Sequence, residues 1–226
     1  MTEIEQVIGY TFNEPKLLQE ALTHSSYTNG KNLKSNERLE FLGDSVLGIT
    51  VAEYLFENLT GLPEGRLTKI RASLVCEDAL YTFAKKIDLG RHIMLGKGEE
   101  NTGGRDRRSI LADAFEALIA AIYLDGGTEK ARGFILSFIP EPDRLSSGMY
   151  MPGDYKTLLQ EIIQQNPEES VEYKITSESG QAHNKTFTAE VLLNGQVIGT
   201  GTGKSKKQAE QQAAKEAVGL MGYETD

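Results

Sequence analysis

The sequence predicts a two-domain protein, in which an all-helical domain is followed by a small α+β domain. Apolar residues recur with helical spacing in the first part of the chain and alternate with strand spacing only later. A stretch rich in proline, glycine and serine, Pro140–Gly153, separates the two patterns. The length of 226 residues allows two domains that each bury a core. We place the helical domain at residues 1–146, the linker at 147–153 and the second domain at 154–226.

The helical domain is predicted from apolar spacing and from helix start and stop signals. Pro15 suits the first turn of a helix, and the pair Gly126-Gly127 ends a long one. We expect two short helices within residues 3–30, and further helices at 36–58, 66–74, 77–87, 110–124 and 130–139. The helix at 36–58 is expected to bury an apolar face that includes Leu39, Leu42, Val46 and Ile49.

Glu37, Glu40 and Asp44 share one face of that helix, because they are three and then four residues apart. Like charges at this spacing repel each other by a few tenths of a kcal/mol per exposed pair. Two interpretations are therefore open: a solvated acidic face, or a face that holds cations.

A second acidic pair, Asp113 and Glu116, lies on the helix predicted at 110–124. The two residues are three apart, on the side opposite the apolar stripe. Small Ala117 and Ala120 continue their side of the helix and would allow another helix to approach closely. Two acids beside such a contact are more costly to leave unpaired than two on an open surface.

The second domain has the order helix, three strands, helix. The expected elements are a helix at 155–165, strands at 171–177, 185–193 and 196–202, and a final helix capped by Ser205. Asn194-Gly195 predicts a two-residue hairpin turn between the last two strands. Lys204, Lys206 and Lys207 crowd the start of the final helix, where they add to its positive end.

Three segments resemble a known family. The decapeptide Asn36–Ser45, NERLEFLGDS, is similar to the signature of the ribonuclease III family of double-stranded-RNA endonucleases, and Leu111–Leu118 resembles the same domain at the expected distance. Gly201–Glu210 and the α-β-β-β-α order resemble the double-stranded-RNA-binding domain. The resemblance implies a ribonuclease III nuclease domain followed by that binding domain. It also implies a Mg²⁺-dependent endoribonuclease, active in RNA processing and decay including rRNA precursors, whose products carry 5′-phosphates, 3′-hydroxyls and short 3′ overhangs.

The resemblance also implies the roles of the acidic residues. Glu40, Asp113 and Glu116 match the family's metal ligands, and Asp44 is a direct ligand or a residue just behind one. Asp44 and Glu116 are the expected catalytic residues, with Glu116 the most critical. Carboxylates from two crossing helices suit Mg²⁺, which prefers oxygen ligands, and Mn²⁺ is a conceivable substitute. Glu37 is expected to face the RNA or a partner subunit. No organic cofactor is expected.

RNA contacts are likewise carried over from the family. The expected contacts are Thr157, Gln160, Glu161, His183 in the loop Gly180–Lys185, and Lys204, Lys206 and Lys207. Such a domain reads duplex RNA largely by its shape and its 2′-hydroxyls. This chain departs from the family at Gln181, where the family usually has proline. For the lysines alone, a solvated basic helix end is the alternative; for Glu64, helix capping alone is the alternative to an RNA contact.

A short overhang requires two sites that cut opposite strands, and one nuclease domain supplies only one. We therefore expect a symmetric homodimer. Phe41 lies off the main apolar stripe of its helix and is either a dimer contact or another core residue. His24 is either a general base or a helix-end hydrogen-bonding residue, and the glycine-rich stretch Gly96–Gly104, with the arginines after it, is either a phosphate cradle or an ordinary loop.

Charge and composition set the remaining limits. The net charge of −9 argues against nucleic acid as a partner unless local basic patches and metal ions offset it. Cys76 is the only cysteine, which fits a reducing compartment, and the longest apolar run, Ala117–Leu124, is too short to cross a bilayer. We expect a soluble cytoplasmic protein without a membrane partner. The alternative functions are a double-stranded-RNA-binding regulator that does not cleave, and a metal-binding helical interaction module.

Overall fold

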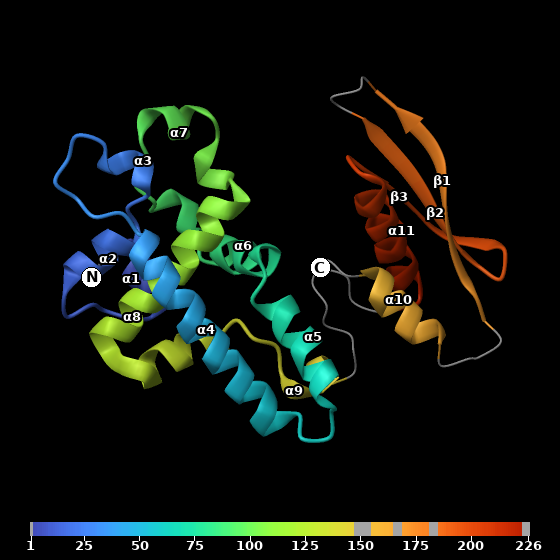
Figure 1. Cartoon of the computed structure of the whole chain (residues 1–226), viewed down its shortest axis with the longest axis horizontal. Coiled ribbons are helices and arrows are strands. Elements are labelled where there is room, and N and C mark those ends of the chain that lie inside the picture. The colour runs from blue at the N-terminus through green and yellow to red at the C-terminus, as the bar shows by residue number, and fades with distance from the viewer. Residues whose placement is uncertain (1, 147–154, 165–168, 181–184, 223–226) are drawn as a thin grey trace. The chain divides into compact units, whose positions relative to one another are not determined.

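The computed structural model describes residues 2–146, 155–164, 169–180 and 185–222. The chain divides into two compact units, Met1–Pro142 and Asp143–Asp226, and each is described by itself (Figure 1). The linker expected at 147–153 lies outside the described residues. The domain boundaries at 146 and 154 therefore stay a prediction.

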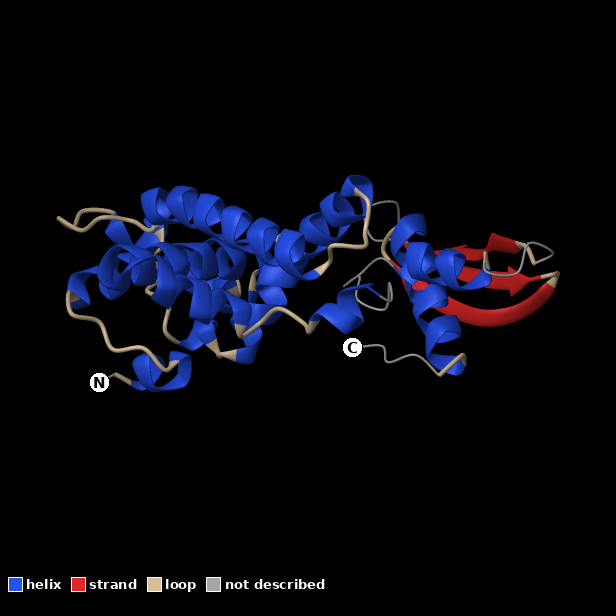
Figure 2. Cartoon of the chain, turned by 90° about the horizontal axis from the view of Figure 1, so that it is seen from below, coloured by secondary structure: helices blue, strands red, loops and turns tan. Residues whose placement is uncertain are grey.

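The first unit is built from helices, which Figure 2 shows in one colour. Its elements are α1 (Glu3–Ile8), α2 (Pro15–Ala21), α3 (Ser25–Thr28), α4 (Glu37–Asn58), α5 (Glu64–Leu74), α6 (Glu77–Lys86), α7 (Lys97–Asn101) and α8 (Arg108–Leu136), with two short 3-10 turns, η1 (Leu89–Arg91) and η2 (Gly104–Asp106). Short α3 and α7 were not expected, because one or two helical turns leave no periodic pattern to detect. α9 (Pro142–Ser146) follows at the boundary and buries Leu145.

α4 packs along α8 at the centre of this unit. The buried side of α4 contains Leu39, Val46, Val51 and Leu55. The expectation that Ile49 joins this core is wrong, since its side chain is 67% exposed. The reason is that the buried side of α4 is centred on Gly43, Leu47 and Thr50, and Ile49 points away from that line.

α8 is two helices joined at a kink. Gly127 has φ 80° and ψ −178°, a backbone conformation that favours glycine. The expected break at Gly126-Gly127 is confirmed. The first segment is buried almost continuously, from Ile110 to Ile122 apart from Asp113 and Glu116. The two acids are thus the half-buried exceptions on the most central helix of the unit.

The second unit is a three-stranded antiparallel sheet with two helices on one face. Its elements are α10 (Tyr155–Ile163), β1 (Val171–Ser179), β2 (Thr186–Leu193), β3 (Gln196–Gly203) and α11 (Lys206–Leu220), with strand order β1-β2-β3. Asn194 and Gly195 both have positive φ, as the predicted hairpin turn requires, and the Ser205 hydroxyl accepts a hydrogen bond from the Gln208 N–H at the start of α11.

Glycines set the distance between β3 and α11. An added Cβ at Gly199, Gly201 or Gly203 would lie within 2.6 Å of backbone atoms of α11. The helix presents Ala209, Ala213 and Ala217 to these glycines, and all three alanines are buried. Alternate residues of β3 therefore pack directly against residues four apart on α11.

The predicted fold class is confirmed in both units: helices alone form the described first unit, and the second has the α-β-β-β-α order. The three strands of the described residues all lie in the C-terminal unit (Figure 2). Within the described residues no helix combines the length and the hydropathy that crossing a membrane would need.

Candidate metal centre and nucleic-acid interface

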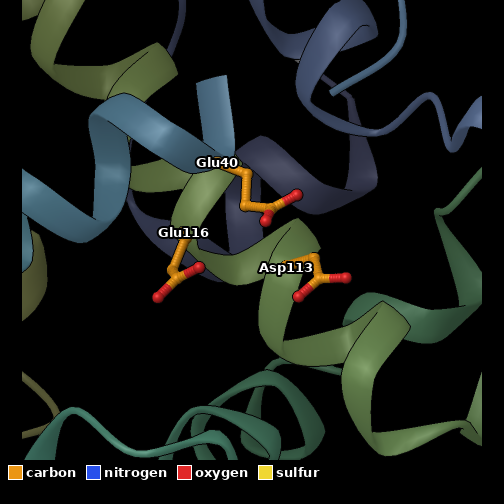
Figure 3. A group of neighbouring side chains, drawn as sticks. All are labelled: Glu40, Asp113 and Glu116. Carbon is orange, nitrogen blue, oxygen red and sulfur yellow. The ribbon is translucent and has the colours of Figure 1, made fainter. Parts of the chain in front are cut away.

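Gly43 brings α4 against α8 at the acidic residues. A Cβ added to Gly43 would lie 1.9 Å from the carbonyl oxygen of Glu116, so the two backbones are in direct contact there. Glu40 lies one turn before Gly43, which places it opposite Glu116 and Asp113. Each of these three acids offers a carboxylate oxygen within 4.8 Å of the others, and Figure 3 shows them projecting from the two helices.

Glu116 has the most altered acidity of the three. Burial raises the pKa of its carboxyl to about 8, with further contributions from the negative charges of Asp44, Glu40 and Asp113. Without a cation, this carboxyl therefore holds a proton at neutral pH, whereas an isolated glutamate would be ionised.

Glu40 and Asp113 are shifted in the same direction. Burial raises the pKa of Glu40, and the charges of Asp113 and Glu37 raise it further. Burial also raises the pKa of Asp113, with Glu77 adding to the rise and His24 opposing it. Glu77 is the first residue of α6, so a third helix contributes negative charge to this site.

The donor set fits a hard divalent cation. Three carboxylates from two helices supply the oxygen ligands that Mg²⁺, Mn²⁺ and Ca²⁺ prefer. Among the ion pairs of the described residues, none joins a lysine or arginine to Glu40, Asp113 or Glu116. A cation would relieve the repulsion that raises their pKa values.

Asp44 and Glu37 lie around this group rather than in it. Asp44 is exposed on α4 and raises the pKa of Glu116 through its charge, but it is not among the three acids whose oxygens lie within 4.8 Å of one another. Glu37 is exposed at the first position of α4, where its carboxylate accepts a hydrogen bond of 2.8 Å from the Ser35 hydroxyl. Their roles as ligand and substrate contact stay predictions.

His24 is engaged at a helix end, as one of its two interpretations required. Its Nδ1 accepts a hydrogen bond from the backbone N–H of Ser26 at 3.2 Å and lies 2.8 Å from the Ser26 hydroxyl. That hydroxyl in turn accepts from the backbone N–H of Gly96 at 2.9 Å. Because Nδ1 is an acceptor, the proton of the neutral ring sits on Nε2.

The glycine-rich loop is tied to the protein by its arginines. Arg105 donates to the carbonyl oxygens of Gly90 and Ile93, both at 2.9 Å, and to the Glu100 carboxylate. The other two arginines are also paired, Arg107 with Glu99 and Arg108 with Asp78. These contacts favour an ordinary structural loop over a phosphate cradle.

Phe41 and Glu64 are both on the surface. The Phe41 side chain is 79% exposed, so the interpretation of it as a core residue is wrong. Glu64 is the first residue of α5, and its carboxylate accepts a hydrogen bond of 2.8 Å from the Thr68 hydroxyl one turn later. Its position suits the helix dipole without any contact to RNA.

The lysines of the C-terminal unit gather at the start of α11. Lys204, Lys206 and Lys207 are exposed, and the Lys204 ammonium lies 3.5 Å from the Thr186 hydroxyl at the beginning of β2. On α10, Thr157 is half-buried and Gln160 is exposed. The side chain of Glu161 and the whole of His183 lie outside the described residues. All these RNA contacts stay predictions.

Two residues of the metal centre escaped sequence reasoning. Gly43 could have been noticed, because it is a glycine in the interior of a long helix, where glycine is unfavourable unless a close contact requires it. Glu77 carried no such signal, since an acid at a helix start is explained by the helix dipole alone.

Both units match known protein families. Residues 14–142 match the family model described as Ribonuclease-III-like, and residues 155–220 match the double-stranded RNA binding motif. The chain is 52% identical over 225 residues to Ribonuclease 3 of Caldanaerobacter subterraneus, covering 98% of each chain. It is 48% identical over 225 residues to Ribonuclease 3 of Listeria innocua, covering 98% of this chain and 97% of the relative.

A solved structure agrees with these relatives. The nuclease domain of ribonuclease III from Campylobacter jejuni, in a study of a flexible region involved in its dimer formation, matches with a TM-score of 0.58 and 45% identity. The match covers 61% of this chain and 94% of that domain. The chain therefore belongs to the ribonuclease III family of double-stranded-RNA endonucleases.

Proposed function

We propose that this endoribonuclease cuts double-stranded RNA at the Glu40–Asp113–Glu116 group, with Mg²⁺ as the bound cation and Mn²⁺ as a substitute. The observation that supports it most is the convergence of three carboxylate oxygens within 4.8 Å, from helices distant in the sequence of a ribonuclease III family member. The products we expect carry 5′-phosphates and 3′-hydroxyls with short 3′ overhangs.

Glu40, Asp113 and Glu116 would hold the cation, with Asp44 as a fourth ligand or a support. When bound, a divalent ion lowers the pKa of a water molecule and offsets charge that develops on the phosphate. The half-buried position of Glu116 strengthens its interaction with a cation relative to an exposed carboxylate. Because its pKa is about 8, cation binding at neutral pH has to displace the Glu116 proton.

The C-terminal unit would hold the duplex while the helical unit cuts it. The exposed lysines at the start of α11 add to the positive end of that helix and would bind phosphates. We propose that Thr157, Gln160 and Glu161 on α10, and His183 before β2, contact the minor groove. The domain boundaries we propose are 1–146 and 154–226, with 147–153 as a linker.

We propose that two copies of the chain assemble into a symmetric dimer, so that both strands are cut. Three large apolar side chains on α4 are exposed: Phe41 at 79%, Ile49 at 67% and Phe56 at 75%. They lie within about 80° of one another around the helix, so all three are on one face, here called the α4 stripe. A second copy would cover this stripe. We place the protein in the cytoplasm, consistent with its single cysteine.

The dimer proposal predicts that Phe41→Arg shifts the protein toward a monomer, because a charge at the stripe cannot be buried without a partner. Light scattering coupled to size-exclusion chromatography measures the mass. Val197→Arg is the matched control, since Val197 is 52% exposed in β3 of the other unit. A dimer that persists in Phe41→Arg, or dissociates equally in Val197→Arg, would remove the α4 stripe as the interface.

The cleavage proposal is tested with a long duplex RNA and the full chain. We expect cutting with Mg²⁺ and none with EDTA. Glu116→Gln should lower cleavage at least about 100-fold while duplex binding in EDTA stays within about twofold, because it removes a metal ligand and leaves the lysine end of α11 intact. Glu129→Gln changes an exposed acid in the segment of α8 after the Gly127 kink; it is the control and should cut normally.

Each other outcome is informative. Binding without cutting in both Mg²⁺ and EDTA would favour the non-cleaving regulator. Equal loss of binding and cutting in Glu116→Gln would make Glu116 a structural residue.

A further inference from the structure

A β-bulge turns Glu178 toward the helices of the C-terminal unit. Up to Ile175, which is opposite Ala189, alternate residues of β1 face α10 and α11. The register then shifts, so that Ser177 pairs with Thr188 and Glu178 pairs with Phe187. Directly paired residues point to the same side of an antiparallel sheet, and a bulge is a common device for redirecting a side chain.

The side on which Glu178 lies is fixed by its neighbours in the same row. Phe187 belongs to the hydrophobic cluster under the helices. Phe187 in turn pairs with Gly203, where an added Cβ would lie 2.6 Å from the backbone nitrogen of Ala209 in α11. The row Glu178, Phe187, Gly203 therefore ends beside the first turn of α11, which carries the lysines.

Glu178 is paired with a lysine at this end of the sheet. The Lys185 ammonium, just before β2, donates to the Glu178 carboxylate, and the two side chains are 44% and 43% exposed. Together with this pair, the charge of Lys206 on α11 lowers the pKa of the Glu178 carboxyl. One carboxylate thus interacts with two of the lysines nearest the expected phosphate-binding edge.

Building on the proposed RNA interface, we propose that Glu178 is an internal counterion that competes with RNA phosphates for Lys185 and Lys206 and so limits the affinity for duplex RNA. The pair is exposed enough to exchange partners. When a phosphate approaches, Lys185 leaves Glu178 for the phosphate, and the freed carboxylate then takes up a cation or stays near the RNA as an unfavourable charge. In either case, RNA binding releases fewer ions overall than it would if the lysine had no such partner.

The strand offers a matched control at its other end. Glu172 is also in β1 and is also paired with a lysine, Lys174, at 3.2 Å, but it lies opposite Leu192, far along the strand from the bulge and the row of Glu178. Glu172→Gln and Glu178→Gln change the net charge by the same amount on the same strand. Any difference between them reports the position of the charge rather than its removal.

The experiment measures binding of a duplex RNA to the full chain in EDTA, at several salt concentrations. We expect Glu178→Gln to bind about twofold to fivefold tighter than the wild type at low salt, as an exposed ion pair allows. Its salt dependence should be steeper by up to about one unit of slope. Glu172→Gln should stay within about 1.5-fold, the change a distant charge produces through screened electrolyte.

A double variant tests the mechanism. In Lys185→Gln, the added Glu178→Gln should bring less than half of its gain in the wild type, because only Lys206 is left to be released. A gain in Glu178→Gln no larger than in Glu172→Gln would overturn the proposal, and weaker binding would instead make Glu178 a direct RNA contact. Absence of duplex binding by the wild type would contradict the proposed function itself, which keeps the two failures distinct. Circular dichroism confirms that each variant is folded.

Discussion

The two units handle charge in opposite ways. In the helical unit, Glu40, Asp113 and Glu116 are brought together although all carry the same sign, and two helices in backbone contact hold them there. In the C-terminal unit, the Glu178 carboxylate pairs with Lys185 just before β2, and the charge of Lys206 at the start of α11 also acts on it. The first arrangement is rigid and lacks a partner of opposite charge among the described lysines and arginines; the second is exposed and can exchange its partners.

The difference suggests how each unit meets its ligand. In a rigid group of half-buried acids, the like charges repel each other already in the free protein, which costs free energy. That repulsion is relieved only when a cation is bound. Exposed lysines beside an exchangeable counterion cost little in the free protein, and in the proposed RNA interface they would leave that carboxylate for a phosphate. Chemistry that needs a fixed geometry and binding that needs adaptable contacts are thus separated into two folds.

The rigid packing of the acidic group should depend on Gly43. Gly43→Ala places a methyl group 1.9 Å from the Glu116 carbonyl oxygen, so α4 and α8 must move apart. We expect a loss of about 3 kcal/mol or more of unfolding free energy, and cleavage should fall with the displaced acids. Thermal unfolding and duplex cleavage measure both.

Gly48→Ala is the matched control on the same helix. No atom lies within 4 Å of a Cβ at Gly48, so alanine there should raise stability by about 0.5–1 kcal/mol through helix propensity. If Gly43→Ala behaves like Gly48→Ala, the close contact does not hold the acids in place.

The corresponding contact in the other unit is at Gly201. A Cβ there would lie 2.2 Å from the Ala213 nitrogen and 2.5 Å from the Ala209 oxygen. Gly201→Ala should therefore separate β3 from α11 and destabilise that unit by about 2–3 kcal/mol. Hydrogen exchange should show faster exchange in 185–222 and unchanged exchange in α4 and α8. Uniform acceleration in both units would mean that their stabilities are coupled.

Much of this organisation was predictable from the sequence. The helix at 37–58, the acidic pair at Asp113 and Glu116 and the hairpin at Asn194-Gly195 each follow from local rules of spacing, capping or turn chemistry. Each of these features depends only on residues close to it in the sequence. The longer α8 was likewise expected as two helices, because a glycine pair interrupts its pattern.

What escaped prediction depends on contacts between distant segments. Periodicity shows that Gly43 lies on the buried side of α4, but not that the backbone of Glu116 meets it. The bulge that redirects Glu178 depends on how β1 pairs with β2, which alternation within β1 does not specify. The prediction that Ile49 is buried was wrong for the same reason, because its burial depends on which side of α4 faces α8.

The charge on the acidic group predicts a dependence of stability on pH. Glu116 has a pKa of about 8 in the folded protein and about 4.3 when unfolded, so the folded state binds the proton more tightly between these values. In EDTA, stability should therefore fall as pH rises from about 4.5 to 8, by at most about 1.4 kcal/mol per pH unit before solvent screening.

Glu116→Gln should reduce this slope, because glutamine has no proton to lose and only the raised pKa values of Glu40 and Asp113 remain. Glu129→Gln should leave the slope unchanged. Thermal unfolding at pH 5, 6.5 and 8 measures the slope. Added Mg²⁺ should stabilise the wild type more at pH 8 than at pH 5, since the cation competes with the proton for the same oxygens. An equal slope in Glu116→Gln and the wild type would mean that the carboxyl does not hold the proton.

The smallest expected effect concerns the exposed lysines of the C-terminal unit. Lys206→Gln removes one of the cations at the start of α11, so the salt dependence of duplex binding should decrease by about one unit of slope and affinity should fall to a similar extent for all duplex sequences. Lys174→Gln is the control, because Lys174 is paired with Glu172 on β1, in a strand position far from the row that ends at α11. Fluorescence anisotropy in EDTA over a range of salt concentrations resolves both variants. If their slopes agree, the phosphates are bound elsewhere, and the contrast between a fixed acidic group and an exchangeable basic one would no longer describe this protein.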